Sequence, residues 1–428
     1  MTKQTIKYLD LCSGIGGFRY GIEAFEKKQK CYNFKCILSA DIKQDAIDTY
    51  NLNFNEKNGK KNINDIEPNN IGSFDLLTAG FPCQPFSSAG KKKGFKDDRG
   101  GMIFKIIDIC KTCKPEYVLL ENVSNLLTID NGKCIDKIVK LFESINYHIS
   151  YKKLNSSLFG CPQSRERVYI MCSKSYNLSN IFDNIKYNKK SCYIKDIIDS
   201  TDKKSTLPEN FTKVLLTTHK KKSIYGCKIN DKRGGAKNIH SWDIEYNGSI
   251  TEDESRLMSK IMLERRKKHW AIKKNIEWMD GMPLTFNDIK TFEKNHNLKT
   301  MLDKLVRMNY LKIEKCKDLI NGKREYKEDS DEGYNICKGK LSFPITKILN
   351  PNDVAPTLTA TDSNRLAIIV DNSIIRNLNK TELKKICGFP ESMLIPSHVN
   401  MYDLFGNMAT PPVITELIRL LLHHKKKA

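Results

Sequence analysis

Two short apolar segments run directly into residues that can do chemistry, and this pattern constrains the fold more than any other. Ser73–Ala79 has the composition of a buried strand and leads into Gly80-Phe81-Pro82-Cys83-Gln84-Pro85-Phe86-Ser87. Tyr117–Leu120 is a second such strand and leads into Glu121-Asn122-Val123. Continuously apolar strands are typical of parallel sheets, whose functional groups gather at the carboxyl ends of the strands. We therefore expect Cys83 and Glu121 at one edge of a parallel α/β sheet.

Each of these two residues has an ordinary structural interpretation beside the chemical one. Pro82 and Pro85 flank Cys83 and fix an extended turn that would present its thiol, although a cysteine is more often a small buried hydrophobe. A carboxylate that leaves a hydrophobic strand is expensive to bury, so Glu121 is a candidate acid or base with a raised pKa. The alternative is that a nearby Arg or Lys neutralises it.

The N-terminus has the layout of a nucleotide-binding unit. The apolar segment Ile6–Leu9 runs into a glycine-rich turn, Asp10–Gly17, which an amphipathic helix follows. A second expected strand, Lys35–Ala40, ends at Asp41, whose carboxylate can accept both hydroxyls of a ribose. Asp41 could also cap the helix expected over Gln44–Asn51.

A row of polar side chains is expected at the other side of the sheet. Ile145–Leu154 and Arg167–Cys172 read as an antiparallel hairpin at its edge. If the intervening segment is extended, Gln163, Arg165 and Arg167 point to one side, which suits phosphate or carbonyl oxygens. Ion pairing with Glu166 or Glu121 is the structural alternative. The basic, glycine-bracketed stretch Gly90–Gly101 suits either a mobile lid or a solvated loop.

Charge and length indicate a large protein with a polyanionic partner. The 428 residues include 72 Lys and Arg against 50 Asp and Glu, a net charge of +22, which favours nucleic acid. No apolar run is long enough for a membrane span, and the 14 cysteines are scattered, as expected of reduced thiols in a cytosolic protein. Cys110 and Cys113 have ligand spacing without a second pair, so no metal site is expected.

The pattern of apolar and basic stretches divides the chain into three segments: 1–175, 176–352 and 353–428. The middle segment alternates basic and short apolar stretches, with clusters at His219–Lys222 and Arg265–Lys268, and predicts an irregular α+β domain. Within it Leu302–Leu311 is expected to be helical and Lys323–Glu332 to be a charged loop. In the last segment Asn379 can cap a helix over Thr381–Cys387, and Pro411-Pro412 can open a final helix to Leu422.

Six motifs in this order resemble the cytosine-C5 DNA methyltransferase family. The resemblance covers roughly the first 170 residues and the last 75, and it is carried by Asp10–Gly17, Gly80–Gln84, Glu121–Val123, Gln163–Arg167, Arg376–Glu382 and Phe405–Asn407. It implies a Rossmann-like S-adenosylmethionine-dependent methyltransferase domain, completed by the C-terminal segment, with a separate target-recognition domain in the middle. It also implies a monomer that modifies double-stranded DNA, beside a restriction endonuclease that acts independently on the same site.

The resemblance also assigns roles to single residues. Asp41 would hold the ribose, Ile42 would pack on the adenine and Asp65 would accept from its amino group. The other residues expected to bind the cofactor are Asp10, Gly14, Gly16, Gly17, Ile66, Pro82, Met102 and Asn407. Those expected to contact DNA are Gln84, Ser87, Asn122, Gln163 and Arg376. The sequence departs from the family at Cys12-Ser13, Asn379-Lys380 and Met408-Ala409, and Cys12 could loosen one cofactor contact.

The expected chemistry explains the motif residues. Cytosine C5 becomes nucleophilic when the Cys83 thiolate adds to C6. Protonated Glu121 would bond N3, and Arg165 or Arg167 would bond O2, where charge develops. The base must leave the duplex to be reached. An RNA (tRNA) cytosine-C5 methyltransferase is the alternative activity, although that branch generally lacks a large insert. A non-catalytic DNA-binding descendant is another, disfavoured because Cys83 and Glu121 are both present.

Overall fold

The computed structural model describes residues 3–81, 101–232, 234–235, 237–277, 281–320, 322–339 and 342–424. The chain forms two compact units. The first comprises Met1–Asp199, Pro351–Ser363 and Asn379–Ala428, and the second comprises Ser200–Asn350 and Asn364–Leu378. The boundaries differ from those expected from composition, since the first unit continues to Asp199 and Asn364–Leu378 belongs to the second.

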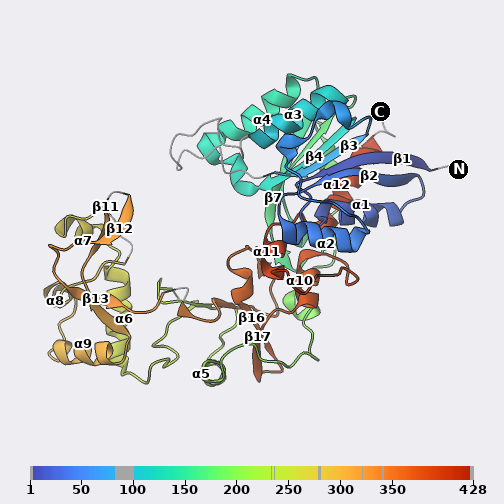
Figure 1. Cartoon of the computed structure of the whole chain (residues 1–428). Coiled ribbons are helices and arrows are strands. Elements are labelled where there is room, and N and C mark those ends of the chain that lie inside the picture. Colours follow the sequence, from blue (N-terminus) through green and yellow to red (C-terminus); the bar gives the residue numbers. More distant parts are fainter. Residues whose placement is uncertain are drawn as a thin grey trace. The chain divides into compact units, whose positions relative to one another are not determined.

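A six-stranded sheet in the order β2-β1-β3-β4-β7-β5 forms the centre of the first unit (Figure 1). Its strands are β1 (Gln4–Leu11), β2 (Tyr32–Ala40), β3 (Leu76–Gly80), β4 (Tyr117–Val123), β5 (His148–Asn155) and β7 (Glu166–Ser173). The first four are mutually parallel, whereas β7 is antiparallel to both β4 and β5. The expected parallel sheet with an antiparallel hairpin at its edge is confirmed.

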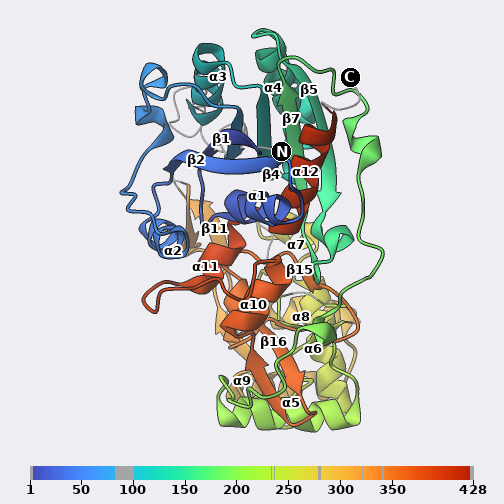
Figure 2. The ribbon, with the colours of Figure 1, turned by 90° about the vertical axis from the view of Figure 1, so that its right-hand side faces the viewer.

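Helices cover both faces of this sheet because its strands are apolar on both sides. One core contains Leu9, Leu77 and Leu120 and packs under α3 (Gly101–Cys113) and α4 (Lys133–Glu143). The opposite core contains Leu119 and packs under α1 (Gly17–Lys27) and α12 (Pro411–His424), as Figure 2 shows for α1 and α12.

The end of the chain completes this second core. A Cβ atom placed on Gly21 of α1 would lie 2.5 Å from Ile414 Cβ of α12, so only glycine lets the two helices approach this closely. Thr415 Oγ1 also donates to Gly21 O at 3.0 Å. The shorter helices of the returning segment are α10 (Lys380–Cys387) and α11 (Met401–Gly406). Asn379 caps α10, as expected, by accepting from Glu382 N at 2.9 Å.

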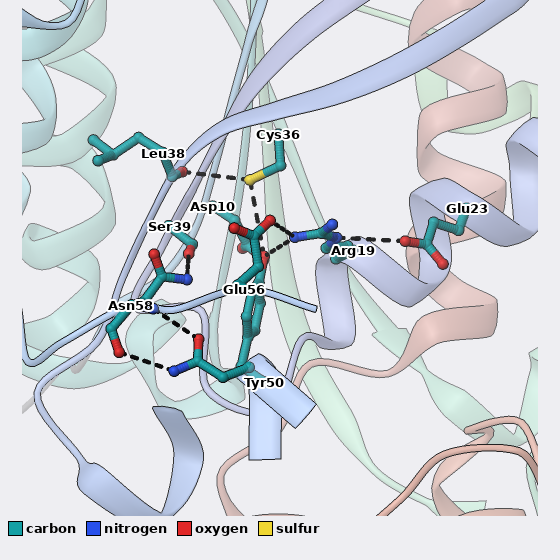
Figure 3. A network of polar contacts seen from close by, with 10 residues as sticks. Asp10, Arg19, Glu23, Cys36, Leu38, Ser39, Tyr50, Glu56 and Asn58 are labelled. Carbon is teal, nitrogen blue, oxygen red and sulfur yellow. Dashed lines mark hydrogen bonds and ion pairs between the residues drawn. The ribbon is translucent and has the colours of Figure 1, made fainter. Parts of the chain in front are cut away.

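A buried polar network lies beneath the glycine-rich turn (Figure 3). Asp10, at the carboxyl end of β1, accepts from Thr78 Oγ1 at 3.2 Å and from Tyr50 Oη of α2 (Gln44–Phe54) at 3.3 Å. Arg19 donates to Tyr50 Oη at 3.3 Å and to Glu56 at 2.9 Å. These contacts tie β1, β3, α1 and α2 together. Burial raises the pKa of Asp10 to about 7, against the opposing effect of its hydrogen bonds.

The second unit contains a five-stranded sheet and a helical region, each with a core of its own. The sheet has the order β17-β16-β14-β8-β9 and consists of β17 (Ile374–Asn377), β16 (Leu366–Val370), β14 (Lys347–Ile348), β8 (Lys228–Ile229) and β9 (Asn238–Ile239). Its core includes Phe211 of α5 (Glu209–Lys221). The helices of the other core are α6 (Glu252–Glu264), α7 (Lys268–Lys273), α8 (Phe286–Phe292) and α9 (Leu298–Arg307).

Two expectations for this unit were correct only in part. The helix expected over Leu302–Leu311 is α9, which starts earlier and ends at Arg307, because Leu311–Glu314 forms strand β10 and pairs with β13 (Gly333–Ile336). Part of the expected charged loop is a strand: β12 (Lys323–Tyr326) pairs antiparallel with β11 (Lys317–Ile320). Gly322, which precedes β12, has a φ of 75°, a conformation that glycine adopts without strain. Among the described helices, none is long and apolar enough to cross a membrane.

The raised pKa of Asp10 predicts how pH acts on stability. Between its ordinary value of 3.8 and about 7, the folded chain keeps a proton that the unfolded chain releases, so the free energy of unfolding falls as pH rises. The Asp10→Asn variant has no carboxyl group here and so lacks this pH-dependent contribution to the free energy of unfolding. Relative to wild type, the variant should therefore gain about 2 kcal/mol between pH 5 and pH 8, measured by chemical denaturation. A difference that does not change with pH would contradict the assignment.

Candidate active site

Strands β3 and β4 bring the first pair of predicted residues to one edge. Gly80, the last residue of β3, lies opposite Glu121 of β4, and a Cβ atom on Gly80 would be 3.7 Å from Glu121 Oε2. The chain leaves β3 here toward Cys83. Pro82, Cys83, Gln84 and Ser87 lie outside the described residues, as does the basic stretch through Gly100. The described residues therefore show that the segment leading to Cys83 begins next to Glu121.

Glu121 combines burial with an unused acceptor. Its exposed fraction is 9%, and Arg167 Nε of the neighbouring strand β7 lies 3.0 Å from its Oε1. This is the ion pair expected as the structural alternative, and within the described residues Oε1 has no other polar partner. Burial raises the pKa of Glu121, although the positive charges of Arg167 and Arg165 oppose the shift. The carboxyl group can thus take a proton and donate it in a hydrogen bond.

The two arginines Arg165, just before β7, and Arg167, within β7, have different surroundings. Arg165, with an exposed fraction of 3%, donates from Nη1 to Leu358 O at 3.3 Å and to Gly406 O at 3.1 Å, and from Nη2 to Met408 O at 2.7 Å. Its guanidinium thereby holds both returning C-terminal segments of the first unit. Arg167, in contrast, directs its Nε at Glu121 and donates from Nη1 to one carbonyl, Glu166 O, at 2.8 Å. The sequence could not distinguish these two environments.

Other residues expected to contact DNA have mainly structural partners. Asn122 Nδ2 donates to Phe81 O at 2.9 Å and so holds the start of the Cys83 segment. Gln163 is buried, and its Nε2 lies 3.6 Å from Cys387 Sγ. Its Oε1 has no hydrogen-bond partner among the described residues. Arg376 of the second unit has an exposed fraction of 1% and donates to Asp202 O and Asn377 O. Its burial argues against a direct DNA contact.

Asp41 connects the turns that follow β1 and β2. Its carboxylate accepts from Gly14 N and from Lys43 N, both at 2.8 Å. The N-cap of α2 is Lys43, so Asp41 is not the helix cap that was the alternative. Gly14 has a φ of 54°, and an added Cβ there would meet nothing within 4 Å. Ile42 is 57% exposed, so its apolar surface is available to a ligand.

A cavity of about 400 Å³ connects these groups within the first unit. It extends from the glycine-rich turn to the Glu121–Arg167 pair. The predicted site residues along it are Gly14, Asp41, Ile42, Glu121, Asn122, Arg165, Arg167 and Asn407. Ile15, Lys43, Leu404 and Gly406 also line it and were missed as site residues. Cys12, which was expected only to loosen a cofactor contact, lines the cavity as well and has a φ of 51°, which is rare outside glycine. The cavity thus joins the expected cofactor and cytosine positions.

The remaining predicted cofactor residues lie behind the cavity wall or away from it. Asp10 is fully buried in the network of Figure 3. Cβ atoms on Gly16 and Gly17 would approach Phe54 Cε2 to 2.4 Å and Ala409 O to 2.2 Å, so close packing alone requires both glycines. Ile66 is part of the core under α3, Met102 packs against that core, and Asp65 is exposed. In the described part, no group of three His, Cys, Asp or Glu side chains could hold a metal.

Comparison with known proteins shows the family to which this chain belongs. The family model for C-5 cytosine-specific DNA methylases matches residues 6–423. Type II methyltransferase M.NlaIV of Neisseria lactamica is 41% identical and M.NgoBV of Neisseria gonorrhoeae is 40% identical, each over 98% of this chain and 99% of its own length. M.BanI of Aneurinibacillus aneurinilyticus is 33% identical over 98% of this chain and 96% of its own.

Two solved structures share the fold at low sequence identity. The S. pombe Dnmt2 methyltransferase is 17% identical with a TM-score of 0.54, and each chain is covered to 98%. The Entamoeba histolytica methyltransferase EhMeth is 16% identical with a TM-score of 0.55, and each chain is covered to 99%. With a family match over almost its whole length, this chain belongs to the C-5 cytosine-specific DNA methylase family and is a DNA (cytosine-5-)-methyltransferase.

Proposed function

We propose that the first unit methylates C5 of a cytosine flipped out of a specific duplex DNA sequence, which the second unit selects. The observation that carries this proposal is the Glu121 carboxyl group. It is buried beside an arginine, keeps an oxygen without a hydrogen-bond partner in the described part, and lies opposite the residue that leads into the Cys83 segment. When Glu121 is protonated, it and the neighbouring guanidinium are both donors, and a pyrimidine ring offers them acceptors at N3 and O2.

The cavity fits S-adenosylmethionine as the methyl donor. The open space above Gly14 accommodates a ligand close to the backbone, and the free acceptor sites of the Asp41 carboxylate suit ribose hydroxyls. Ile42 offers an apolar surface for the adenine, and Asn407 lines the cavity from the returning segment. When bound, S-adenosylmethionine supplies an electrophilic methyl group. Asp10, Gly16 and Gly17 would support this site from behind, while Asp65, Ile66, Pro82 and Met102 stay predictions.

Different side chains activate the base at different atoms. The Cys83 thiolate adds to C6 and makes C5 nucleophilic. Protonated Glu121 donates to N3 as negative charge moves there, and its burial raises its pKa and so favours the protonated form. Arg167, next to Glu121, is the guanidinium placed to bond O2. Arg165 has committed both terminal nitrogens to backbone carbonyls, and so positions the site.

Duplex DNA is the proposed substrate, with the second unit as its recognition element. The net charge of +22 favours a polyanion, and a compact unit interrupting the catalytic one gives room for sequence readout. The relatives named Type II methyltransferases support a role in restriction-modification, beside an endonuclease that acts independently on the same site. We propose that the protein acts as a monomer. These relatives make the tRNA-directed alternative the weaker one.

Side-by-side assays test substrate and nucleophile together. Tritiated methyl groups should pass from S-adenosylmethionine to duplex DNA and not to tRNA, and bisulfite sequencing should place them at one cytosine in a fixed sequence. Cys83→Ser should abolish transfer while DNA binding in a gel-shift assay persists, since a hydroxyl at this position is a far weaker nucleophile than a thiolate. Preference for tRNA, or turnover by the variant near the wild-type rate, would overturn the proposal.

Substitution by lysine should separate the two arginines. Arg165→Lys loses carbonyl contacts made by a charged group and should lower the free energy of unfolding by about 2–4 kcal/mol, measured by chemical denaturation. Arg167→Lys keeps the charge beside Glu121, so stability should change by less than about 1 kcal/mol. Methyl transfer should nevertheless fall about 10- to 100-fold in kcat/KM, because the donor to O2 is displaced. Equal losses of stability would contradict this division.

A further inference from the structure

The β11–β12 hairpin of the second unit has two chemically different faces. It is a two-stranded sheet in which Lys317 pairs with Tyr326, Asp318 with Glu325, Leu319 with Arg324 and Ile320 with Lys323 (Figure 1). Side chains alternate between faces along a strand, and cross-strand partners share a face. One face therefore carries Lys317, Leu319, Arg324 and Tyr326, and the other carries Asp318, Ile320, Lys323 and Glu325.

Charge is segregated between these two faces. Both carboxylates of the hairpin, Asp318 and Glu325, lie on one face. The opposite face has two cations, two large apolar side chains and no carboxylate of the hairpin itself, and the Tyr326 hydroxyl donates to Glu314 Oε2 of the neighbouring strand β10 at 3.3 Å. Lys317 Nζ lies 4.4 Å from the centre of the Tyr326 ring, which places both residues on that side. We call this side the basic face. Exposure to solvent alone does not require positive and negative side chains to lie on different faces, whereas a surface that binds a polyanion does.

The acidic face and the base of the hairpin are attached to the rest of the unit. Asp318 Oδ1 accepts from Glu277 N at 3.0 Å. The strand ends are joined where Lys327 N donates to Cys316 O at 2.8 Å, and Cys316 is part of the helical core. Lys327 Nζ donates to Asn275 O at 3.0 Å. The hairpin thus projects from a fixed base.

On the basic face, large side chains are exposed to solvent. The exposed fraction is 47% for Leu319 and 44% for Tyr326, and Arg324 is also exposed, whereas the opposite face has one large apolar side chain, Ile320, which is 38% exposed. Neighbouring apolar and cationic side chains at the surface mark an interaction site more often than either type alone. The sequence cluster Arg265–Lys268 is a poorer candidate, because Arg265 is buried against Asn335 and Lys267 pairs with Glu264.

We propose that the basic face of the β11–β12 hairpin enters the major groove of the target duplex and reads base edges there. The major groove is about 12 Å wide and admits a two-stranded ribbon, whose strands lie about 5 Å apart. Arg324 has the donor geometry to bond guanine O6 and N7, Leu319 can contact a thymine methyl group, and Lys317 can reach the phosphates. The inference rests on the proposed function, since it takes duplex DNA as the substrate.

Two neighbouring cations on opposite faces provide the test. Arg324→Ala and Lys323→Ala each remove one positive charge, one residue apart, on exposed positions of the same strand. If the basic face reads the groove, Arg324→Ala should lower kcat/KM for target DNA about tenfold or more. Lys323→Ala should change it about threefold at most, as expected for loss of a general electrostatic contribution. The KM for S-adenosylmethionine and the melting temperature should stay at wild-type values in both variants.

Site choice gives a second, independent readout. In bisulfite sequencing of a randomised duplex library, Arg324→Ala should raise methylation at sequences that differ from the target by one base pair, relative to the target itself. Lys323→Ala should leave this ratio unchanged. Equal effects of the two substitutions, or wild-type rate and site choice for Arg324→Ala, would overturn the inference and leave the proposed function standing. Failure of the wild-type protein to methylate any duplex in the same assay would instead remove the proposed function.

Discussion

The arrangement of the first unit depends on holding one carboxyl group, that of Glu121, in an apolar environment. Glu121 follows the buried segment Tyr117–Leu120 in β4, and an ionised carboxylate there is costly unless it is paired. The sheet order meets this constraint. Strand β7, antiparallel to β4, brings Arg167 to Glu121, and parallel β3 brings Gly80, whose missing side chain leaves space at the carboxyl. Partial neutralisation leaves the pKa raised, so the group stays able to donate a proton.

The catalytic unit is assembled from segments that lie far apart in the sequence, and these segments meet at the same site. The catalytic sheet ends before the second unit begins, yet the cavity needs Gly406 and Asn407 from the far end of the sequence. Arg165 fastens that end through three backbone carbonyls, and Gly17 and Gly21 let α1 approach it without a side chain between. Backbone carbonyls accept hydrogen bonds whatever side chains they carry. The catalytic unit can therefore be closed by these contacts independently of the residues that the second unit uses to read DNA.

Local signals in the sequence predicted the parts of this structure that local physics determines. The apolar strands, the glycine-rich turn and the Asn379 cap each follow from neighbouring residues, and all are present. The motifs also identified the edge of the sheet at which Glu121 and Arg167 meet. What the sequence could not show depends on tertiary contacts. Arg165 and Arg167 are two residues apart in one motif, yet only the fold reveals that one bonds carbonyls and the other faces Glu121. Arg376 and Asp10 were expected to meet ligands, but the fold buries both. The β12 strand was missed because its residues are charged and its stability comes from pairing with β11.

The protonation of Glu121 is the most direct test of this arrangement. In protein labelled with ¹³C at glutamate Cδ, the Glu121 resonance can be assigned by its loss in a Glu121→Gln variant and followed as a function of pH. Its pKa should lie above the ordinary value of 4.5, because burial outweighs the two nearby guanidinium groups, and it should rise further in Arg167→Ala, where one of those charges is removed. A pKa at or below 4.5 in the wild-type protein, unchanged by Arg167→Ala, would mean that Glu121 is a solvated or fully neutralised carboxylate and not the proton donor to cytosine.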